Sequence, residues 1–162
     1  MRVISGEAKG RKLLGPAGTF TRPMQDKIKE ALFSMLWSLD VDPARVADLY
    51  AGTGAIGIEA LSRGATEADF VDQNAAACKV VRANLANTRL ADRARVHQTS
   101  VLGFIARDHK PYDLVILDPP YADPEIGATV DKLAGSTLIQ SGTIVAIGHW
   151  PRLELPEEIG RL

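Results

Sequence analysis

The sequence predicts an α/β fold, in which a doubly wound and mainly parallel sheet is preceded by a small hairpin and a helix. Three observations indicate this fold: short apolar runs alternate with amphipathic segments after residue 45, a glycine-rich turn follows the first run, and an Asp-Pro-Pro-Tyr turn ends the fourth. Strands that alternate with helices form parallel sheets through right-handed crossovers. The 162 residues, 46% of them hydrophobic, suffice for one core and predict a single domain over residues 1–162.

The chain is expected to begin with a basic hairpin and loop over residues 1–22, because short apolar runs flank Gly6 and Gly10. An amphipathic helix follows over residues 23–38, with Pro23 in its first turn and apolar residues along one face. The α/β core then covers residues 45–150. We expect its strands at 46–50, 68–72, 95–98, 113–117 and 143–147, and its helices at 54–64, from 74 onward, at 101–107 and at 126–135.

Charge is distributed unevenly along a chain that is nearly neutral overall, with 19 basic and 20 acidic residues. Residues 1–29 carry a net charge of +5, whereas residues 113–131 contain five acidic side chains and no basic one. A basic leading segment predicts contact with a polyanion, and a solvated charged face is the alternative.

The remaining composition bounds the location of the protein and the classes of site it can hold. The single cysteine, Cys78, excludes an internal disulfide and is typical of a reducing compartment. No signal peptide is recognisable, and no apolar run approaches the roughly 20 residues that span a bilayer. We therefore expect a cytoplasmic protein without membrane contact, and a monomer. Three scattered histidines, His97, His109 and His149, predict no metal site.

A glycine-rich turn, Asp48–Gly57, ends the first predicted strand and opens a helix. Glycines there let a ligand approach the backbone, and the helix amino terminus offers free N–H groups. Gly52, Gly54 and Gly57 match the dinucleotide fingerprint, and Asp72 follows at the distance of a ribose-binding acid, so an oxidoreductase is one candidate. Asp48 instead favours S-adenosylmethionine, because a carboxylate suits the ammonium group of that cofactor and is a handicap beside a pyrophosphate.

A second turn, Asp118-Pro119-Pro120-Tyr121, ends the apolar run Leu114–Leu117. Two prolines cannot continue a strand, so the turn holds a carboxylate, main-chain carbonyls and an aromatic ring rigidly at the strand end. This arrangement suits a flat ring that carries an amine, such as a nucleobase, and an ordinary strand-to-loop turn is the alternative. In a doubly wound sheet the order reverses beside the first strand, which predicts that the two turns line one crevice.

The two turns and several flanking motifs resemble the bacterial small-subunit ribosomal RNA guanine-N2 methyltransferases. The likeness extends from Arg2 to about Ile147, and its most specific part is Leu61-Ser62-Arg63-Gly64-Ala65 after the glycine-rich turn. Further matches are Arg22-Pro23, Asp26-Lys27 and Glu30-Ala31-Leu32-Phe33. The resemblance implies a class I, Rossmann-like methyltransferase fold, S-adenosylmethionine as cofactor, and ribosomal RNA or the assembling small subunit as partner.

The resemblance also implies roles for individual residues. The residues expected at the cofactor are Asp48, Tyr50, Ala51, Gly52, Thr53, Gly54, Asp72, Gln73 and Ser100. The catalytic set is Asp118, Pro119, Pro120 and Tyr121, in which Asp118 and the Pro119 carbonyl accept hydrogens from the guanine amine and Tyr121 stacks on the base. The residues expected to contact RNA are Lys9, Arg11, Lys12, Arg22 and Lys27.

The sequence departs from the family pattern at four places. Ser100 stands where the family usually has an Asp that reaches the adenine amine, Met24 replaces a Thr, and Gly148 stands where Glu is frequent. The sequence also stops at Leu162, whereas relatives continue into further strands that include an antiparallel pair. We therefore expect those terminal strands to be missing and the strand at 143–147 to be a nearly exposed edge.

Several functions stay open from the residues and the resemblance together. Guanine-N2 methylation of small-subunit ribosomal RNA leads. The alternatives are an adenine-N6 or DNA amino-methyltransferase, a dinucleotide-binding oxidoreductase, and an RNA-binding protein that retains the fold without catalysis.

Overall fold

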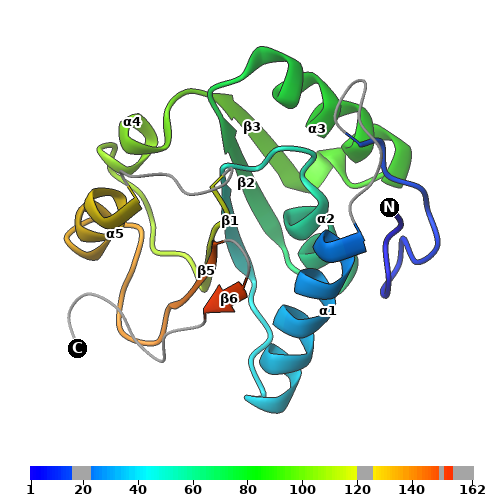
Figure 1. Ribbon diagram of the computed structural model, residues 1–162, viewed down its shortest axis with the longest axis horizontal. Coiled ribbons are helices and arrows are strands. Elements are labelled where there is room, and N and C mark those ends of the chain that lie inside the picture. Colours follow the sequence, from blue (N-terminus) through cyan, green and yellow to red (C-terminus); the bar gives the residue numbers. More distant parts are fainter. Residues whose placement is uncertain (16–22, 120–125, 150–151, 155–162) are drawn as a thin grey trace.

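The sheet observed in the computed structural model has the reversed strand order that the sequence predicts (Figure 1). The structure describes residues 1–15, 23–119, 126–149 and 152–154, with the side chains of all of these except residues 23–25, 149 and 152–154. In this part of the chain six strands follow the order β3-β2-β1-β4-β5-β6. Five are parallel: β1 (Arg45–Leu49), β2 (Glu67–Asp72), β3 (Ala94–Gln98), β4 (Leu114–Leu117) and β5 (Ile144–His149).

The sixth strand, β6 (Arg152–Glu154), corrects the expectation that β5 forms a nearly exposed edge. It pairs with β5 in antiparallel fashion, with Ile147 opposite Glu154 and His149 opposite Arg152. The sheet is therefore mixed at this end, and β3 forms the opposite edge. A strand of three residues is too short to give a periodic signal of its own.

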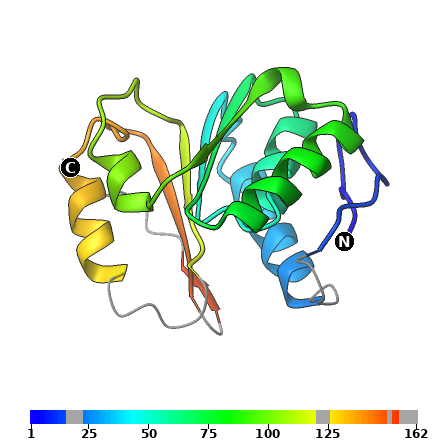
Figure 2. The same ribbon diagram turned by 90° about the horizontal axis from the view of Figure 1, so that it is seen from above.

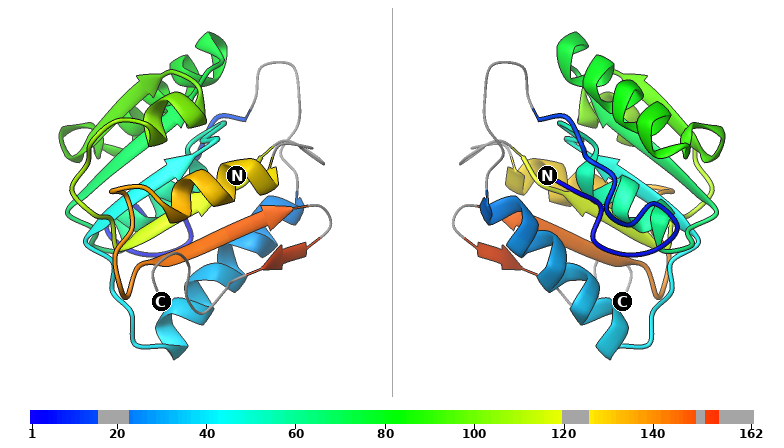
Figure 3. Two further views of the ribbon diagram at one scale, coloured as in Figure 1. Left: turned by 90° about the vertical axis from the view of Figure 1, so that its left-hand side faces the viewer. Right: turned by 90° about the vertical axis from the view of Figure 1, so that its right-hand side faces the viewer.

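Helices cover both faces of the sheet (Figures 2 and 3). On one face lie α1 (Pro23–Ser38), α2 (Ala55–Ser62) and α3 (Ala75–Thr88), and on the other lie α4 (Val101–Ile105) and α5 (Ile126–Ala134). A 3-10 turn, η1 (Ala91–Arg93), connects α3 to β3. Each face has its own hydrophobic core: Leu32, Ile58 and Phe70 belong to the first, and Leu49, Phe104 and Leu133 to the second.

The first fifteen residues form a more irregular hairpin than the sequence predicts. Within them the structure has one isolated antiparallel bridge, between Arg2 and Lys12, and backbone hydrogen bonds from Val3 to Arg11 and from Gly10 to Val3. The segment packs against the α2 and α3 side of the sheet (Figure 2). We call residues 1–15 the N-terminal segment.

No helix in the described residues is long and apolar enough to cross a membrane.

Candidate active site

The carboxyl ends of β1 and β4 are neighbours, which confirms that the two turns of the sequence meet at one edge of the sheet. The strands pair in parallel, with Asp48 opposite Ile116 and Leu49 opposite Leu117. The glycine-rich turn after β1 and Asp118 after β4 therefore emerge side by side at the point where the strand order reverses. Ligands of open α/β sheets bind at this switch point.

The glycine-rich turn has left-handed backbone at Tyr50, Gly52 and Gly54, with φ angles of 60°, 59° and 80°. A Cβ built on Gly52 meets no atom within 4 Å, so this glycine borders open space and serves the turn through its φ angle. The turn is fastened to the end of β2, because the Ala51 N–H donates to the Val71 carbonyl (2.9 Å) and the Gly52 N–H donates to Asp72 Oδ2 (3.0 Å).

Asp48 is a buried carboxylate of β1 that contacts the first turn of α2. Its side chain is 2% exposed, and its Oδ2 accepts a hydrogen bond from the Gly57 N–H at 3.0 Å. Burial raises the pKa of Asp48 to about 8; the Gly57 hydrogen bond opposes this rise, and the negative charges of Asp118 and Asp72 add to it. A cation beside Asp48 would reverse the penalty, so the residue suits the ammonium group of an amino-acid ligand.

The third glycine of the fingerprint has a packing role. A Cβ on Gly57 would lie 2.4 Å from Phe70 Cε2 and 3.1 Å from Asp48 Oδ2, so only glycine lets α2 approach β1 and β2 this closely. Asp48 also occupies the Gly57 N–H, one of the helix-terminal donors that a pyrophosphate uses. The occupied N–H disfavours the dinucleotide interpretation, whereas close helix–strand packing at the third glycine is compatible with either cofactor.

Asp72 and Ser100 are engaged in turns at the ends of their strands. Besides the bond to Gly52, Asp72 Oδ1 accepts from the Asn74 N–H at 2.9 Å, and a carboxylate with two bonds still has acceptor positions for ribose hydroxyls. Ser100 is exposed, and its Oγ accepts from the Gly103 N–H at 3.0 Å as the cap of α4. Gln73 is exposed next to Asp72.

Tyr50 and Thr53, two residues predicted at the cofactor, contact elements on opposite faces of the sheet. The Tyr50 hydroxyl lies 3.4 Å from Thr129 Oγ1 of α5, on the sheet face opposite α2. The Thr53 side chain is buried, and its carbonyl accepts a hydrogen bond from Asn84 Nδ2 at 2.9 Å.

Asp118 is half-buried, and Pro119 is buried. β4 and β5 pair with Leu117 opposite Ile147, so Gly148 comes level with Asp118. A Cβ built on Gly148 would lie 2.6 Å from Asp118 Oδ1, which means that the carboxylate uses the space that the missing side chain leaves. Gly148, at a position where Glu is frequent in the family, therefore leaves room for the Asp118 carboxylate. Pro120, Tyr121 and Arg22 lie outside the described residues.

The predicted RNA-contacting residues within the described part of the chain are exposed: Lys9, Arg11, Lys12 and Lys27. Arg11 also donates from Nη1 to the Asn87 carbonyl of α3 at 3.2 Å. They are distributed over the N-terminal segment and the start of α1, on the α2 and α3 side of the sheet (Figure 2). No cluster of three metal-ligating side chains occurs in the described ranges.

The sequence interpretation missed a set of buried polar residues that hold the N-terminal segment. Glu59 accepts from the N–H groups of Ile4 (2.9 Å) and Ser5 (3.0 Å) and pairs with buried Lys29 (3.3 Å). Ser62 Oγ accepts from the Ala8 N–H at 2.9 Å and donates to the Ser5 carbonyl at 2.6 Å. The family-specific motif around Ser62 is therefore a docking surface for this segment.

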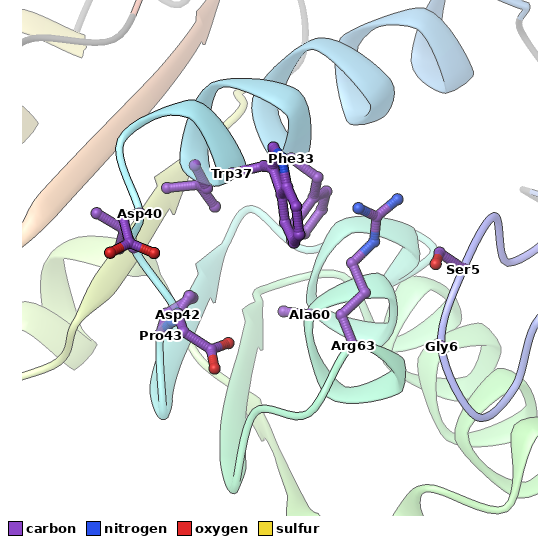
Figure 4. A pocket seen from close by; sticks show the side chains of 11 residues that line it. Ser5, Gly6, Phe33, Trp37, Asp40, Asp42, Pro43, Ala60 and Arg63 are labelled. Atoms are coloured by element: carbon purple, nitrogen blue, oxygen red, sulfur yellow. The ribbon is translucent and has the colours of Figure 1, made fainter.

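A cavity of about 420 Å³ lies away from the strand ends described above (Figure 4). It is formed by the end of α1, the loop before β1, the end of α2 and the N-terminal segment. The Arg63 guanidinium stacks on the Phe33 ring at 4.5 Å from its centroid, and Trp37 is 86% exposed beside them. Because this cavity is at the amino ends of the strands, it is separate from the candidate active site.

Comparison with known proteins agrees with this geometry. The family model described as Conserved hypothetical protein 95 matches residues 1–162. YlbH of Bacillus subtilis (strain 168), named as a candidate rRNA methyltransferase, is 38% identical over 165 residues, which cover 100% of this chain and 89% of YlbH. Ribosomal RNA small subunit methyltransferase D of Escherichia coli (strain K12) is 36% identical over 133 residues, which cover 82% of this chain and 66% of that protein.

Solved structures give the same result. The candidate methyltransferase yhhF from Escherichia coli matches with a TM-score of 0.81 and 33% identity, covering 92% of this chain and 80% of that chain. A hypothetical protein from Thermus thermophilus, TTHA0928, matches with a TM-score of 0.78 and 30% identity, covering 92% and 85%. With its glycine-rich turn, its Asp118 turn and these relatives, the chain belongs to the family of the bacterial small-subunit ribosomal RNA methyltransferases.

Proposed function

We propose that this protein transfers a methyl group from S-adenosylmethionine to the exocyclic N2 amine of a guanine in small-subunit ribosomal RNA. The observation that carries the proposal is the adjacency of the glycine-rich turn and Asp118 at the ends of paired strands β1 and β4. The names of the relatives support a ribosomal RNA substrate. The proposal includes a monomeric enzyme that acts in the cytoplasm.

The residues of the glycine-rich turn fit the cofactor that methyltransferases of this family generally use. Asp48 would hold the ammonium group of the methionine part, Gly52 and Gly54 would border it, and Asp72 would accept hydrogen bonds from the ribose. When bound, the cofactor supplies an electrophilic methyl group on sulfur. Gly52 leaves room for close approach, and the ammonium group would favour the ionised form of Asp48, whose pKa burial raises in the ligand-free protein.

Asp118 would act on the amine that receives the methyl group. Its carboxylate would accept a hydrogen bond from the N2 amine and so orient the nitrogen lone pair for an in-line displacement. The new N–C bond forms as the S–C bond breaks, nitrogen gains positive charge, and the carboxylate stabilises that charge and accepts the departing proton. The base must leave its pairing and stacking partners first, which costs a few kcal/mol.

The test is incubation with S-adenosylmethionine and unmodified small subunits, naked ribosomal RNA or DNA, followed by nucleoside mass analysis. We expect N2-methylguanosine from the ribosomal substrate. N6-methyladenosine or methylated DNA would support the amino-methyltransferase alternatives. Calorimetry with S-adenosylhomocysteine and NADH separates the oxidoreductase, since binding of NADH alone would contradict the proposal.

A matched pair of variants tests catalysis. Asp118→Ala is expected to retain S-adenosylhomocysteine affinity and to lose methyl transfer by at least about a hundredfold, in the range of a general acid–base residue. Asp108→Ala, an exposed carboxylate after α4, is the control and should retain full turnover. Unchanged turnover in Asp118→Ala would remove this residue from the mechanism, and an inactive wild-type chain that binds RNA would favour the non-catalytic alternative.

A further inference from the structure

Asn84 is a buried polar residue on the inner side of α3, in the same row as the core residues Val81 and Leu85. Its side chain is 0% exposed. A buried amide must satisfy its hydrogen-bonding groups within the protein, so the partners of Asn84 indicate what it is for.

The partners of Asn84 belong to two separate parts of the molecule. Asn84 Oδ1 accepts from the Leu14 N–H at 2.7 Å, and its Nδ2 donates to the Leu14 carbonyl at 3.1 Å. The same Nδ2 donates to the Thr53 carbonyl at 2.9 Å, within the glycine-rich turn. One side chain therefore joins the N-terminal segment to the cofactor turn.

Few side chains can replace this one. The site requires one acceptor for an N–H and two donors for two carbonyls, which an amide supplies and a carboxylate, hydroxyl or alkyl group does not. The same part of α3 also packs closely on the glycine-rich turn. Val81, on the turn of α3 before Asn84, lies 3.2 Å from the position of a Cβ on Gly54.

The segment that Asn84 grips leads toward residues with a predicted role at the substrate. Leu14 is preceded by Lys9, Arg11 and Lys12 and is followed eight positions later by Arg22. Arg11 is itself bonded to the Asn87 carbonyl of α3, and Glu59 and Ser62 hold the earlier part of the segment to α2. Helices α2 and α3 both border the glycine-rich turn, so a change in the turn has a direct route to the segment.

We propose that Asn84 is a positioning residue that couples cofactor binding at the glycine-rich turn to the order of the N-terminal segment on the RNA-binding side. The inference rests on the proposed function of the turn as a cofactor site. A ligand that restricts the motion of Thr53 also restricts the Asn84 side chain that is bonded to it. Through Asn84 it restricts the backbone of Leu14. By linkage, RNA that holds the segment in place then favours the cofactor by the same factor.

The experiment is amide hydrogen exchange at Leu14 with and without S-adenosylhomocysteine, in wild type, Asn84→Asp and Asn87→Asp. Asn84→Asp preserves shape and one acceptor but removes both donors. Asn87→Asp makes the same chemical change at an exposed position on the same helix. Without ligand, Asn84→Asp should lose about tenfold in Leu14 protection, because the Leu14 N–H keeps its acceptor but the hydrogen bond that holds the Leu14 carbonyl is lost, while the control stays at the wild-type value.

Adding S-adenosylhomocysteine should increase Leu14 protection in wild type and in Asn87→Asp but not in Asn84→Asp. Leu85→Ala, a core variant of the same helix, separates coupling from a general loss of stability. Compared at denaturant concentrations that give it the same folded population as Asn84→Asp, it should still show the ligand-induced increase in Leu14 protection. If ligand binds and Leu14 protection is unchanged in wild type, or rises equally in Asn84→Asp, the coupling is overturned and the proposed function stands. If calorimetry finds no ligand binding at all, the cofactor site itself fails and the coupling is overturned with it.

Discussion

Two carboxylates at the strand ends are positioned by neighbours rather than by their own strands. Asp48 is oriented by the Gly57 N–H of α2, and Asp118 by the space above Gly148 of β5. Both neighbours are glycines on other elements. Each carboxylate has room in its present position because the neighbouring residue has no side chain. At this scale, we expect the proposed activity to depend on the two glycines as much as on the two acids.

Asp48 makes the stability of the ligand-free protein depend on pH. Its pKa in the folded protein is raised to about 8, whereas in the unfolded chain it has the ordinary value of 3.8. The contribution of the raised pKa to the free energy of unfolding is therefore complete below pH 4. It is lost as pH rises to 8, by at most about 1.4 kcal/mol per pH unit. Asp48→Asn mimics the neutral form, so its stability advantage over wild type should grow between pH 5 and 8.

Urea unfolding at pH 5, 6.5 and 8 measures this difference. Asp108→Asn, which removes an exposed carboxylate, controls for the change in net charge and should show no comparable trend. A constant difference between Asp48→Asn and wild type over this range would mean that Asp48 is ionised in the folded protein. The same variant should bind S-adenosylhomocysteine more weakly, because the ligand ammonium loses its counter-charge.

Gly148→Ala tests the placement of Asp118 without altering the acid itself. The new Cβ would come 2.6 Å from Asp118 Oδ1, so the carboxylate must move away from its present position. Because misplacement by about 1 Å costs up to a hundredfold in rate, we expect a ten- to hundredfold loss of kcat with unchanged S-adenosylhomocysteine affinity. Gly127→Ala on α5, where a Cβ meets nothing within 4 Å, is the matched control and should retain activity. Equal turnover of the two variants would show that Asp118 tolerates the shift.

At the scale of elements, the N-terminal segment is held by polar contacts with α1, α2 and α3 as well as by its buried apolar side chains Val3, Ala8 and Leu13. Glu59 is fully buried and binds two backbone N–H groups, buried Lys29 and Arg63 (2.8 Å). Lys29 also donates to the Arg2 carbonyl at 2.9 Å. A buried charge therefore satisfies backbone groups of an irregular segment that has little sheet pairing.

Glu59→Gln should therefore be one of the more damaging conservative substitutions. It leaves Lys29 as a buried charge without its partner and takes one acceptor from the segment, which predicts a loss of about 3 kcal/mol in unfolding free energy. Glu67→Gln is the control, since Glu67 makes its ion pairs with Arg45 and Arg95 at a partly exposed site and should cost less than about 1 kcal/mol. Denaturant unfolding compares them, and similar losses would show that the buried pair contributes no more than a surface pair.

The regular elements could be predicted from the sequence because their patterns are local. The helix at Pro23–Ser38 has the predicted bounds, the strand at Arg45–Leu49 is shifted by one residue from prediction, and the strand at Leu114–Leu117 begins one residue later than predicted. The contacts that build the site are not local: Asp48 to Gly57 spans a turn and the start of a helix, and Asn84 reaches Leu14 across 70 residues. Asn84 did leave a signal, because it is a polar residue in the apolar row of α3.

At the scale of the whole molecule, we predict that RNA approaches the candidate site along the basic N-terminal segment. The basic side chains Lys9 and Lys12 are exposed on the N-terminal segment, which is docked beside the cofactor half of the sheet. Lys110 is equally exposed but precedes β4, at the amino edge of the sheet and away from the site. The two locations allow the contribution of position to be separated from that of charge alone.

Removing Lys9 and Lys12 together should weaken RNA binding and flatten its dependence on salt. Each phosphate contact that is lost reduces the slope of log affinity against log salt concentration by about one, so the double alanine variant should lose up to about two. Lys110→Ala should leave the slope unchanged. Phosphate contacts carry no sequence information, so the double variant should still methylate the same nucleoside at saturating RNA. Titrations of RNA at several salt concentrations measure the slope. If Lys110→Ala flattens the slope as much as each substitution in the segment, the RNA-binding surface is not localised on the N-terminal segment. The proposed coupling through Asn84 would then not connect RNA binding to the cofactor turn.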